Sequence, residues 1–120
     1  MFNVHVIAVA SLAAVVAVGC GGAPKPEARL SSSEGAIRGA EEAGALNSPQ
    51  AALHLKLAKE ERDKAVDLVN HGENERASHV LERAEADAEL AVALAREATA
   101  KDDAQKTLAE VQDLKKKAAQ

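Results

Sequence analysis

The chain has 120 residues and one cysteine, Cys20, and it carries a formal net charge of −4 with both signs interspersed. These totals exclude an intrachain disulfide and argue against a basic surface that binds nucleic acid. Trp and Tyr are absent and the single phenylalanine is Phe2, so a core built largely from alanine would bury little apolar area. Because Ala, Glu, Lys, Arg and Leu favour helices, we expect elongated helices rather than a compact domain with a pocket for a small-molecule substrate.

The first 19 residues have the pattern of a secretory signal peptide. Residues 4–18 are almost wholly apolar, and this run is shorter than the roughly 20 residues that a membrane-spanning helix needs. No Lys or Arg precedes Lys25, so the usual positive start of a signal peptide is missing. We interpret residues 1–19 as a signal peptide that takes no part in the fold.

The apolar run ends in Gly19-Cys20 with small residues before the cysteine, and this resembles the lipobox of bacterial lipoproteins. Ala17 departs from the motif, in which leucine is usual at that position. The resemblance implies cleavage before Cys20 and acylation of its sulfur and its new amino group, which would anchor the protein in a membrane. By similarity to enterobacterial sorting, Gly21 implies an outer-membrane lipoprotein that faces the periplasm. The alternative is a buried or accidental cysteine.

Residues 20–32 are predicted to be the lipidated cysteine and a flexible tether, because two prolines and a glycine pair oppose regular structure there. Ser31 and Glu34 have the spacing of a capping box, so we expect a helix from residue 33 to about Leu46.

Gly35 and Gly39 form a GxxxG pattern in this first helix. Charged neighbours such as Glu34 and Arg38 exclude a lipid-buried segment. We therefore interpret the two glycines as marks of close packing between soluble helices.

A proline separates this helix from the next one. Ser48 is a good N-cap and Pro49 suits position N1, so a helix is predicted from Pro49 to about Asn70. Gly72 is expected to end it as a left-handed residue, with Asn74 as the cap of the third helix. The connection is short, so the second and third helices must be antiparallel. The stripe of the second helix is Ala51, Leu55, Ala58, Arg62, Ala65 and Val69. The stem of Arg62 can pack on this stripe while its guanidinium reaches solvent.

From Glu73 to Gln120 the chain contains no Gly and no Pro, which predicts one helix of about 45 residues. Counting across the turn places Ala58 against Ala84. Residues 99–103 are the weakest stretch, where the helix is expected to fray or kink. The apolar stripe of this helix recurs in 4-3-4-3 steps at Ala77, Leu81, Ala84, Ala88, Ala91, Ala95 and Ala98.

The predicted fold is all-α, an elongated antiparallel helical hairpin with a kinked first arm, in which Pro49 only bends the arm. The expected domains are the signal peptide at 1–19, the lipidated cysteine and tether at 20–32, the alanine-rich hairpin at 33–100 and a C-terminal helical extension at 101–120.

Four short motifs follow one another along the predicted hairpin: Ala40-x-x-Ala43-Gly44-Ala45, Ser48-Pro49-Gln50-Ala51, Asn70-x-Gly72-Glu73 and Asp87-Ala88-x-Leu90-Ala91. Together they resemble an alanine-rich helical domain of bacterial envelope lipoproteins, catalogued as domain of unknown function 4398. The resemblance implies a helical fold in the cell envelope, and this family has no established activity to transfer.

His54, His71 and His79 are the histidines that follow the signal peptide, and they have neither i,i+4 spacing nor an HExxH pattern, as a helical zinc site would require. The sequence has no Ser-His-Asp order, no glycine-rich phosphate loop and no CxxC motif. We therefore expect no catalytic, metal-binding or cofactor-binding residue, and no enzyme activity.

Two functional classes remain. The first is a lipid-anchored structural or adaptor protein, held to the membrane through Cys20, whose hairpin contacts another envelope protein or a second copy of itself. The second is a periplasmic chaperone-like module that clamps client segments, which needs an apolar concave patch that alanine supplies poorly. We favour the first class. Lys115, Lys116 and Lys117 are interpreted as complements of the helix dipole, with contact to anionic cell-wall polymer or lipid headgroups as the alternative.

Overall fold

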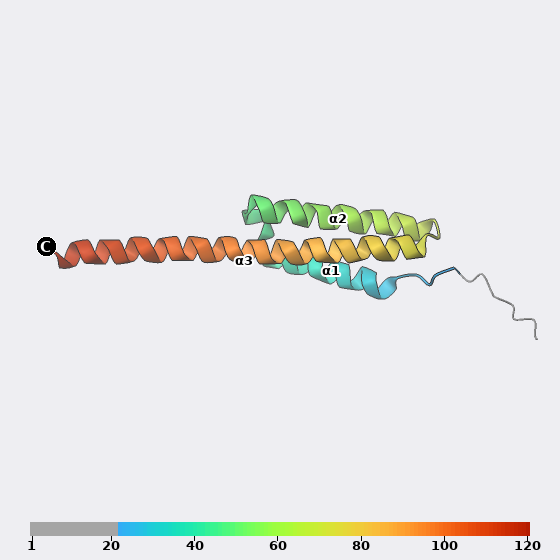
Figure 1. The fold of residues 1–120 in the computed structure, drawn as a ribbon, viewed down its shortest axis with the longest axis horizontal. Helices are drawn as coiled ribbons and strands as arrows, with labels where there is room; N and C mark the ends of the chain where they lie inside the picture. The colour runs from blue at the N-terminus through green and yellow to red at the C-terminus, as the bar shows by residue number, and fades with distance from the viewer. Residues whose placement is uncertain (1–21) are drawn as a thin grey trace, which may run out of the picture.

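The computed structural model describes residues 22–120, and its regular structure within that range is helical (Figure 1). The predicted signal peptide and the predicted lipidation site Cys20 lie outside the described residues. The prediction of an elongated, all-helical fold is confirmed. Helix α1 spans Glu27–Glu42, a short 3₁₀ helix η1 spans Ala45–Asn47, α2 spans Pro49–Asn70 and α3 spans Asn74–Ala118.

Helices α1 and α2 both lie along the first half of α3, and the second half of α3 extends beyond them (Figure 1). Helix α1 runs parallel to α3, and near the start of both helices Arg29 Nη2 lies 2.8 Å from Glu82 Oε1. Helix α1 runs antiparallel to α2, and Lys59 Nζ of α2 lies 2.5 Å from Glu41 Oε1 at the end of α1. The predicted α2–α3 hairpin is therefore present as part of a three-helix bundle.

The first arm does not have the simple kink that we expected at Pro49. Gly44 follows α1 with a φ of 79°, a left-handed conformation that ends the helix, and its N–H donates to the Glu41 carbonyl. Ser48 is extended, as residues before proline usually are, and Pro49 occupies N1 of α2 as predicted. These two breaks reverse the chain, so α1 covers the same part of α3 as α2 does.

The first helix also begins earlier than we expected. Helix α1 starts at Glu27 directly after Pro26, so residues 27–32 of the predicted tether are helical. Ser31 therefore lies inside the helix and is not an N-cap. The proline ring restricts φ to values near those of a helix, and Leu30 packs on the core, so both features favour this earlier start.

The core between α2 and α3 is a seam of alanines, and it largely confirms the predicted stripes. Leu68 is buried where we expected Val69, and Ala98 is partly exposed. His54 Nδ1 lies 2.7 Å from Asp87 Oδ1, close to the register obtained by counting across the turn. We call the buried line of α3 the inner seam; it consists of Ala77, Leu81, Ala84, Ala88, Ala91 and Ala95.

The turn between α2 and α3 has the predicted left-handed glycine. Gly72 has a φ of 77°, and its N–H donates to the Val69 carbonyl at 3.0 Å. The N–H of Glu73 donates to the Leu68 carbonyl at 2.9 Å. This pair of bonds is a Schellman motif, which satisfies carbonyls that the end of α2 would otherwise leave unpaired.

Asn74 does not cap α3 as we expected, because it is the first residue of the helix and Glu73 occupies the N-cap position. Its side chain instead bonds outside the helix, where Nδ2 donates to the Ala23 carbonyl at 2.6 Å. The short segment before α1 is thereby held against the start of α3.

The GxxxG pattern of α1 does not mark a close helix contact, contrary to our interpretation. A Cβ atom added at Gly39 would meet no atom within 4 Å, and one at Gly35 would meet only the Arg38 guanidinium at 3.9 Å. The buried face of α1 consists instead of Ser33, Ile37 and Ala40.

Helix α3 is continuous over 45 residues, about 67 Å, which confirms the predicted length. The helix shows no interruption between Thr99 and Asp103, where we expected a weak point. Every residue from Thr99 onward is exposed, and we call residues 99–118 the overhang. Among residues 22–120, no helix combines the length and the apolar character that crossing a bilayer requires.

Candidate functional site

The three histidines that follow the predicted signal peptide lie in separate places. His54 sits between α2 and α3 against Asp87, and His79 Nδ1 lies 3.4 Å from a carboxylate of the next turn. His71 Nδ1 donates to the Asp67 carbonyl at 2.8 Å at the end of α2. Within residues 22–120 the structure brings together no group of three or more His, Cys, Asp or Glu side chains.

Basic side chains lie at the C-terminal ends of the two long helices. At the end of α2, the hydrogen bond to the Asp67 carbonyl raises the pKa of His71, and the negative charges of Asp67 and Glu73 raise it further. The last turn of α3 carries Lys115, Lys116 and Lys117. Both arrangements place positive or potentially positive side chains beside the partial negative charge of a helix C-terminus. Complementing the helix dipole in this way is the role that we predicted for the three lysines.

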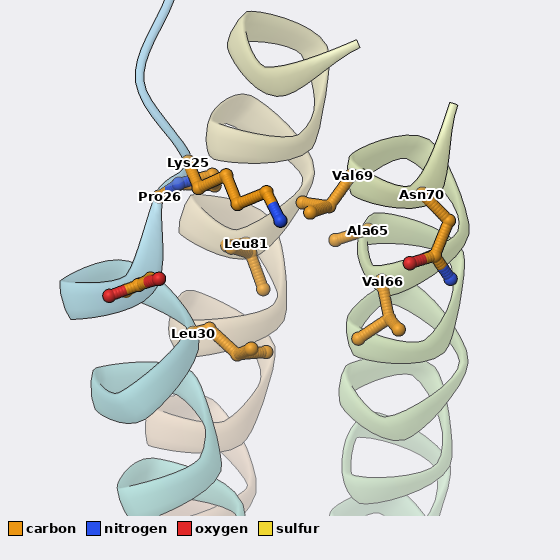
Figure 2. A pocket seen from close by; sticks show the side chains of 9 residues that line it. Lys25, Pro26, Leu30, Ala65, Val66, Val69, Asn70 and Leu81 are labelled. Carbon is orange, nitrogen blue, oxygen red and sulfur yellow. The ribbon is translucent and has the colours of Figure 1, made fainter. Parts of the chain in front are cut away.

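An apolar cleft of about 250 Å³ lies where the starts of α1 and α3 meet the end of α2 (Figure 2). Its lining includes Leu30 from α1, Val66 and Val69 from α2, and the buried Leu81 of α3. Lys25, from the segment before α1, extends across the mouth of the cleft toward α2 (Figure 2). The cleft is smaller than the 300–1,000 Å³ that is typical of ligand pockets, so it has room for one or two apolar side chains.

This cleft was not predicted from the sequence, because Leu30 falls within the segment that was expected to be the tether. A signal was available, since Leu30, Ser33, Ile37 and Ala40 follow one another at helical spacing of three and four residues. That spacing extends the buried face of α1 back to Leu30 and predicts a helical start before Ser31.

A second line of mostly apolar residues runs along α3 on the face opposite the inner seam. Nine residues, or two and a half turns, separate Ala77 of the inner seam from Ala86, where this line begins. Leu90, Val111 and Leu114 on this line are 42%, 42% and 63% exposed. We call it the outer seam; it consists of Ala86, Leu90, Ala93, Glu97, Ala100, Ala104, Thr107, Val111, Leu114 and Ala118, all exposed.

These features offer surfaces for contact with other molecules. The cleft is lined by one ammonium group, from Lys25, and one carboxylate, from Glu27, and otherwise mainly by apolar side chains. The outer seam is long, narrow and flanked by charges, which is the pattern that helices use to bind other helices. Chemically, the arrangement is suited to recognising an apolar side chain or another helix.

Comparison with known proteins relates most of the helical bundle to one family. Residues 28–107, about two thirds of the chain, match the model described as Domain of unknown function (DUF4398). The matched range begins in α1 and ends within the overhang. No curated protein and no solved structure matches the chain significantly.

Proposed function

Because this chain belongs to the DUF4398 family, a domain of unknown function, we propose a function from its own residues. The proposal is a lipid-anchored structural or adaptor protein of the bacterial cell envelope, with its helical bundle in the periplasm. The observation that carries it is the apolar run of residues 4–18 that ends in Gly19-Cys20 shortly before the bundle begins. Acylation of Cys20 would anchor the protein, and Gly21 favours the outer membrane.

The place where the cysteine joins the bundle supports an adaptor role. Six residues separate Cys20 from Glu27, where α1 begins, and six extended residues reach about 20 Å. The start of α1 lies at the same end of the bundle as the α2–α3 turn (Figure 1). An acylated Cys20 would therefore hold this end near the lipid headgroups. Helix α3 leads away from that end, and the overhang begins about 37 Å further along it.

Metabolic labelling with a fatty acid tests the anchor directly in cells that express the full chain. We expect label on the wild-type protein and none on Cys20→Ser, because the cysteine sulfur and the amino group freed by cleavage are the acylation sites. Fractionation of the same cells should place the wild type with the outer membrane. Equal labelling of the two proteins, or no label on either, would contradict the proposal.

A periplasmic client-binding module is the second candidate, and the apolar cleft favours it. The cleft takes one or two side chains, which is little surface for holding an unfolded segment, so we prefer the adaptor role. Crosslinking in intact envelopes followed by capture of the protein separates the two. A client-binding module should lose its captured proteins in Val66→Asp, which places a charge at the cleft, whereas an adaptor should lose them in Leu108→Asp, on the overhang.

A further inference from the structure

The outer seam repeats with the period of a coiled coil. Its ten positions follow strict 4-3-4-3 steps from Ala86 to Ala118 and span 33 residues, more than four heptads. Coiled coils are indicated when such a repeat is sustained over three to four heptads. Helices α1 and α2 pack on the opposite side of α3, so the outer seam is accessible along its whole length.

We propose that two copies of this chain pair antiparallel through their outer seams. In an antiparallel coiled coil the a positions of one helix face the d positions of the other. The outer seam alternates a and d positions, and it satisfies this rule in a symmetric register. That register places Leu90 opposite Leu114 of the second copy and Ala93 opposite Val111 of the second copy. Leu94 and Leu108, which flank the seam on one side, also face each other. Because the pair is symmetric, each of these contacts occurs twice.

The charges beside the outer seam fit the same register. Glu89 faces Lys117 of the second copy, and Arg96 faces Glu110 of the second copy, again twice each. Glu89, Arg96 and Glu110 make no ion pair within residues 22–120, although every one of them is exposed. Lys115, equally unpaired in the same range, comes to lie near Asp87 of the second copy. Opposite charges in these flanking positions set partner choice and orientation in coiled coils.

A parallel pair in register fits the charges less well. It would place Arg96 beside Lys101 of the second copy, which is repulsive, and its favourable contact would be Glu110 with Lys115. In the antiparallel pair, like charges meet near the symmetry axis. There Lys101 lies opposite Lys101 of the second copy, and Asp103 lies opposite Asp103 of the second copy. Both have partners within their own chain, since Lys101 Nζ lies 2.5 Å from Glu97 Oε1 and Asp103 Oδ1 lies 3.7 Å from a lysine.

Two polar residues interrupt the outer seam, and they specify the register. Glu97 faces Thr107 of the second copy in the proposed pair, and a shift by one heptad would place Glu97 against apolar residues instead. A polar residue at a single seam position reduces stability but fixes register and orientation. The inference deepens the proposed adaptor role, on which it rests, by naming a second copy as the partner; it does not depend on the lipid anchor.

Cysteine crosslinking tests the orientation in the full chain. Leu90→Cys and Leu114→Cys are each introduced with Cys20→Ser, so that each chain carries one cysteine, and one variant carries a size tag. We expect a short bismaleimide to join the two variants when they are mixed, and to join neither with itself. Two copies of position 90 are about 36 Å apart in the antiparallel pair.

The other outcomes of this experiment overturn the proposal in distinct ways. Crosslinking of each variant with itself would mean a parallel pair. An absence of crosslinks in every mixture would mean that the outer seam does not bind a second copy. The Cys20→Ser background removes the acylation site, so this result bears on pairing alone, whereas the labelling experiment bears on the anchor alone.

A charge exchange tests the register with a matched control. Lys117→Glu should raise the dissociation constant of the dimer by roughly tenfold, because two attractive pairs become repulsive. Adding Glu89→Lys to that variant should restore the wild-type value. Lys116→Glu makes the same change of charge on the face away from the outer seam and should have little effect. Equal effects of the two lysine variants, or no rescue by Glu89→Lys, would refute the register.

Discussion

The two halves of α3 place their apolar side chains in opposite ways. In the packed half, the buried inner seam is alanine except for Leu81. In the overhang, the exposed side chains include Leu108, Val111 and Leu114, which are 60%, 42% and 63% exposed. A helix with no further partner is expected to bury its larger apolar residues and to expose its smaller ones.

The difference follows from whether another helix of the bundle packs closely against each half of α3. Alanine at most positions of the inner seam lets the backbones of α2 and α3 come close together, and a leucine in place of one of these fully buried alanines would have no space. Within residues 22–120 no other helix lies beside the overhang, so its leucines and valine contribute nothing to the core of the bundle (Figure 1). Helix α3 therefore packs on its own chain with one face and leaves the outer seam exposed on the other.

The overhang nevertheless stays helical for local reasons. An isolated helix of about 20 residues is marginal in water, because forming its first turn is unfavourable. The overhang continues a helix that packing has already nucleated, so this cost does not arise again. Ion pairs one turn apart support it, since Lys101 Nζ lies 2.5 Å from Glu97 Oε1 and Lys117 Nζ lies 2.7 Å from Asp113 Oδ2.

The largest expected effect comes from adding bulk to the inner seam. Ala84 is fully buried against α2, so Ala84→Leu should push the helices apart and lower the free energy of unfolding by about 1–3 kcal/mol. Ala109 lies 25 residues further along α3, almost seven turns, and therefore on the same face, but in the exposed overhang. Ala109→Leu should be nearly neutral. Urea unfolding monitored by circular dichroism gives both values.

Equal losses of unfolding free energy in the two alanine variants would contradict the difference between the two halves of α3. Such a result would mean that the overhang face around Ala109 is also packed, against a neighbour that the bundle does not contain. Two neutral variants would mean that α2 and α3 do not form a tight antiparallel pair.

A smaller effect is expected at the turn that holds the packed half together. Gly72 has a φ of 77°, and a β-branched residue is strongly disfavoured there, so Gly72→Val should destabilise the bundle by about 1–2 kcal/mol. Gly39→Ala is the control, because its new methyl group meets no atom within 4 Å. Thermal unfolding should show a lower midpoint for Gly72→Val alone; an unchanged midpoint would mean that the strain is relieved by a different turn.

Local signals were enough to predict the α2–α3 hairpin. Pro49 at N1, Gly72 after the last turn of α2 and the 4-3 spacing of the alanines each act within a few residues of the chain. Because the connection is so short, the antiparallel register followed by counting. The length of α3 followed from the absence of Gly and Pro after Glu73.

Tertiary packing decided the features that local sequence patterns did not predict. The capping pattern at Ser31 was a real local signal, but burial of the face that contains Leu30 and Ile37 extends α1 back to Glu27. The cleft draws on three separate segments, so its shape depends on the reversal after Gly44. The outer seam was likewise present in the sequence, but the positions of α1 and α2 decide which line of α3 stays exposed.

The smallest expected effect concerns the ion pair where the packed half of α3 gives way to the overhang. The hydrogen bond from Lys101, and then its positive charge, lower the pKa of Glu97 below its ordinary value of 4.5. A carboxyl whose pKa is lower in the folded state stabilises the helix above its ordinary pKa, and this contribution is lost as the pH falls through the lowered value. Titration of the Glu97 carboxyl carbon by NMR should therefore give a lower pKa in the wild type than in Lys101→Ala. Equal values would mean that the pair does not form in solution, and that packing of the first half of α3 alone keeps the boundary helical.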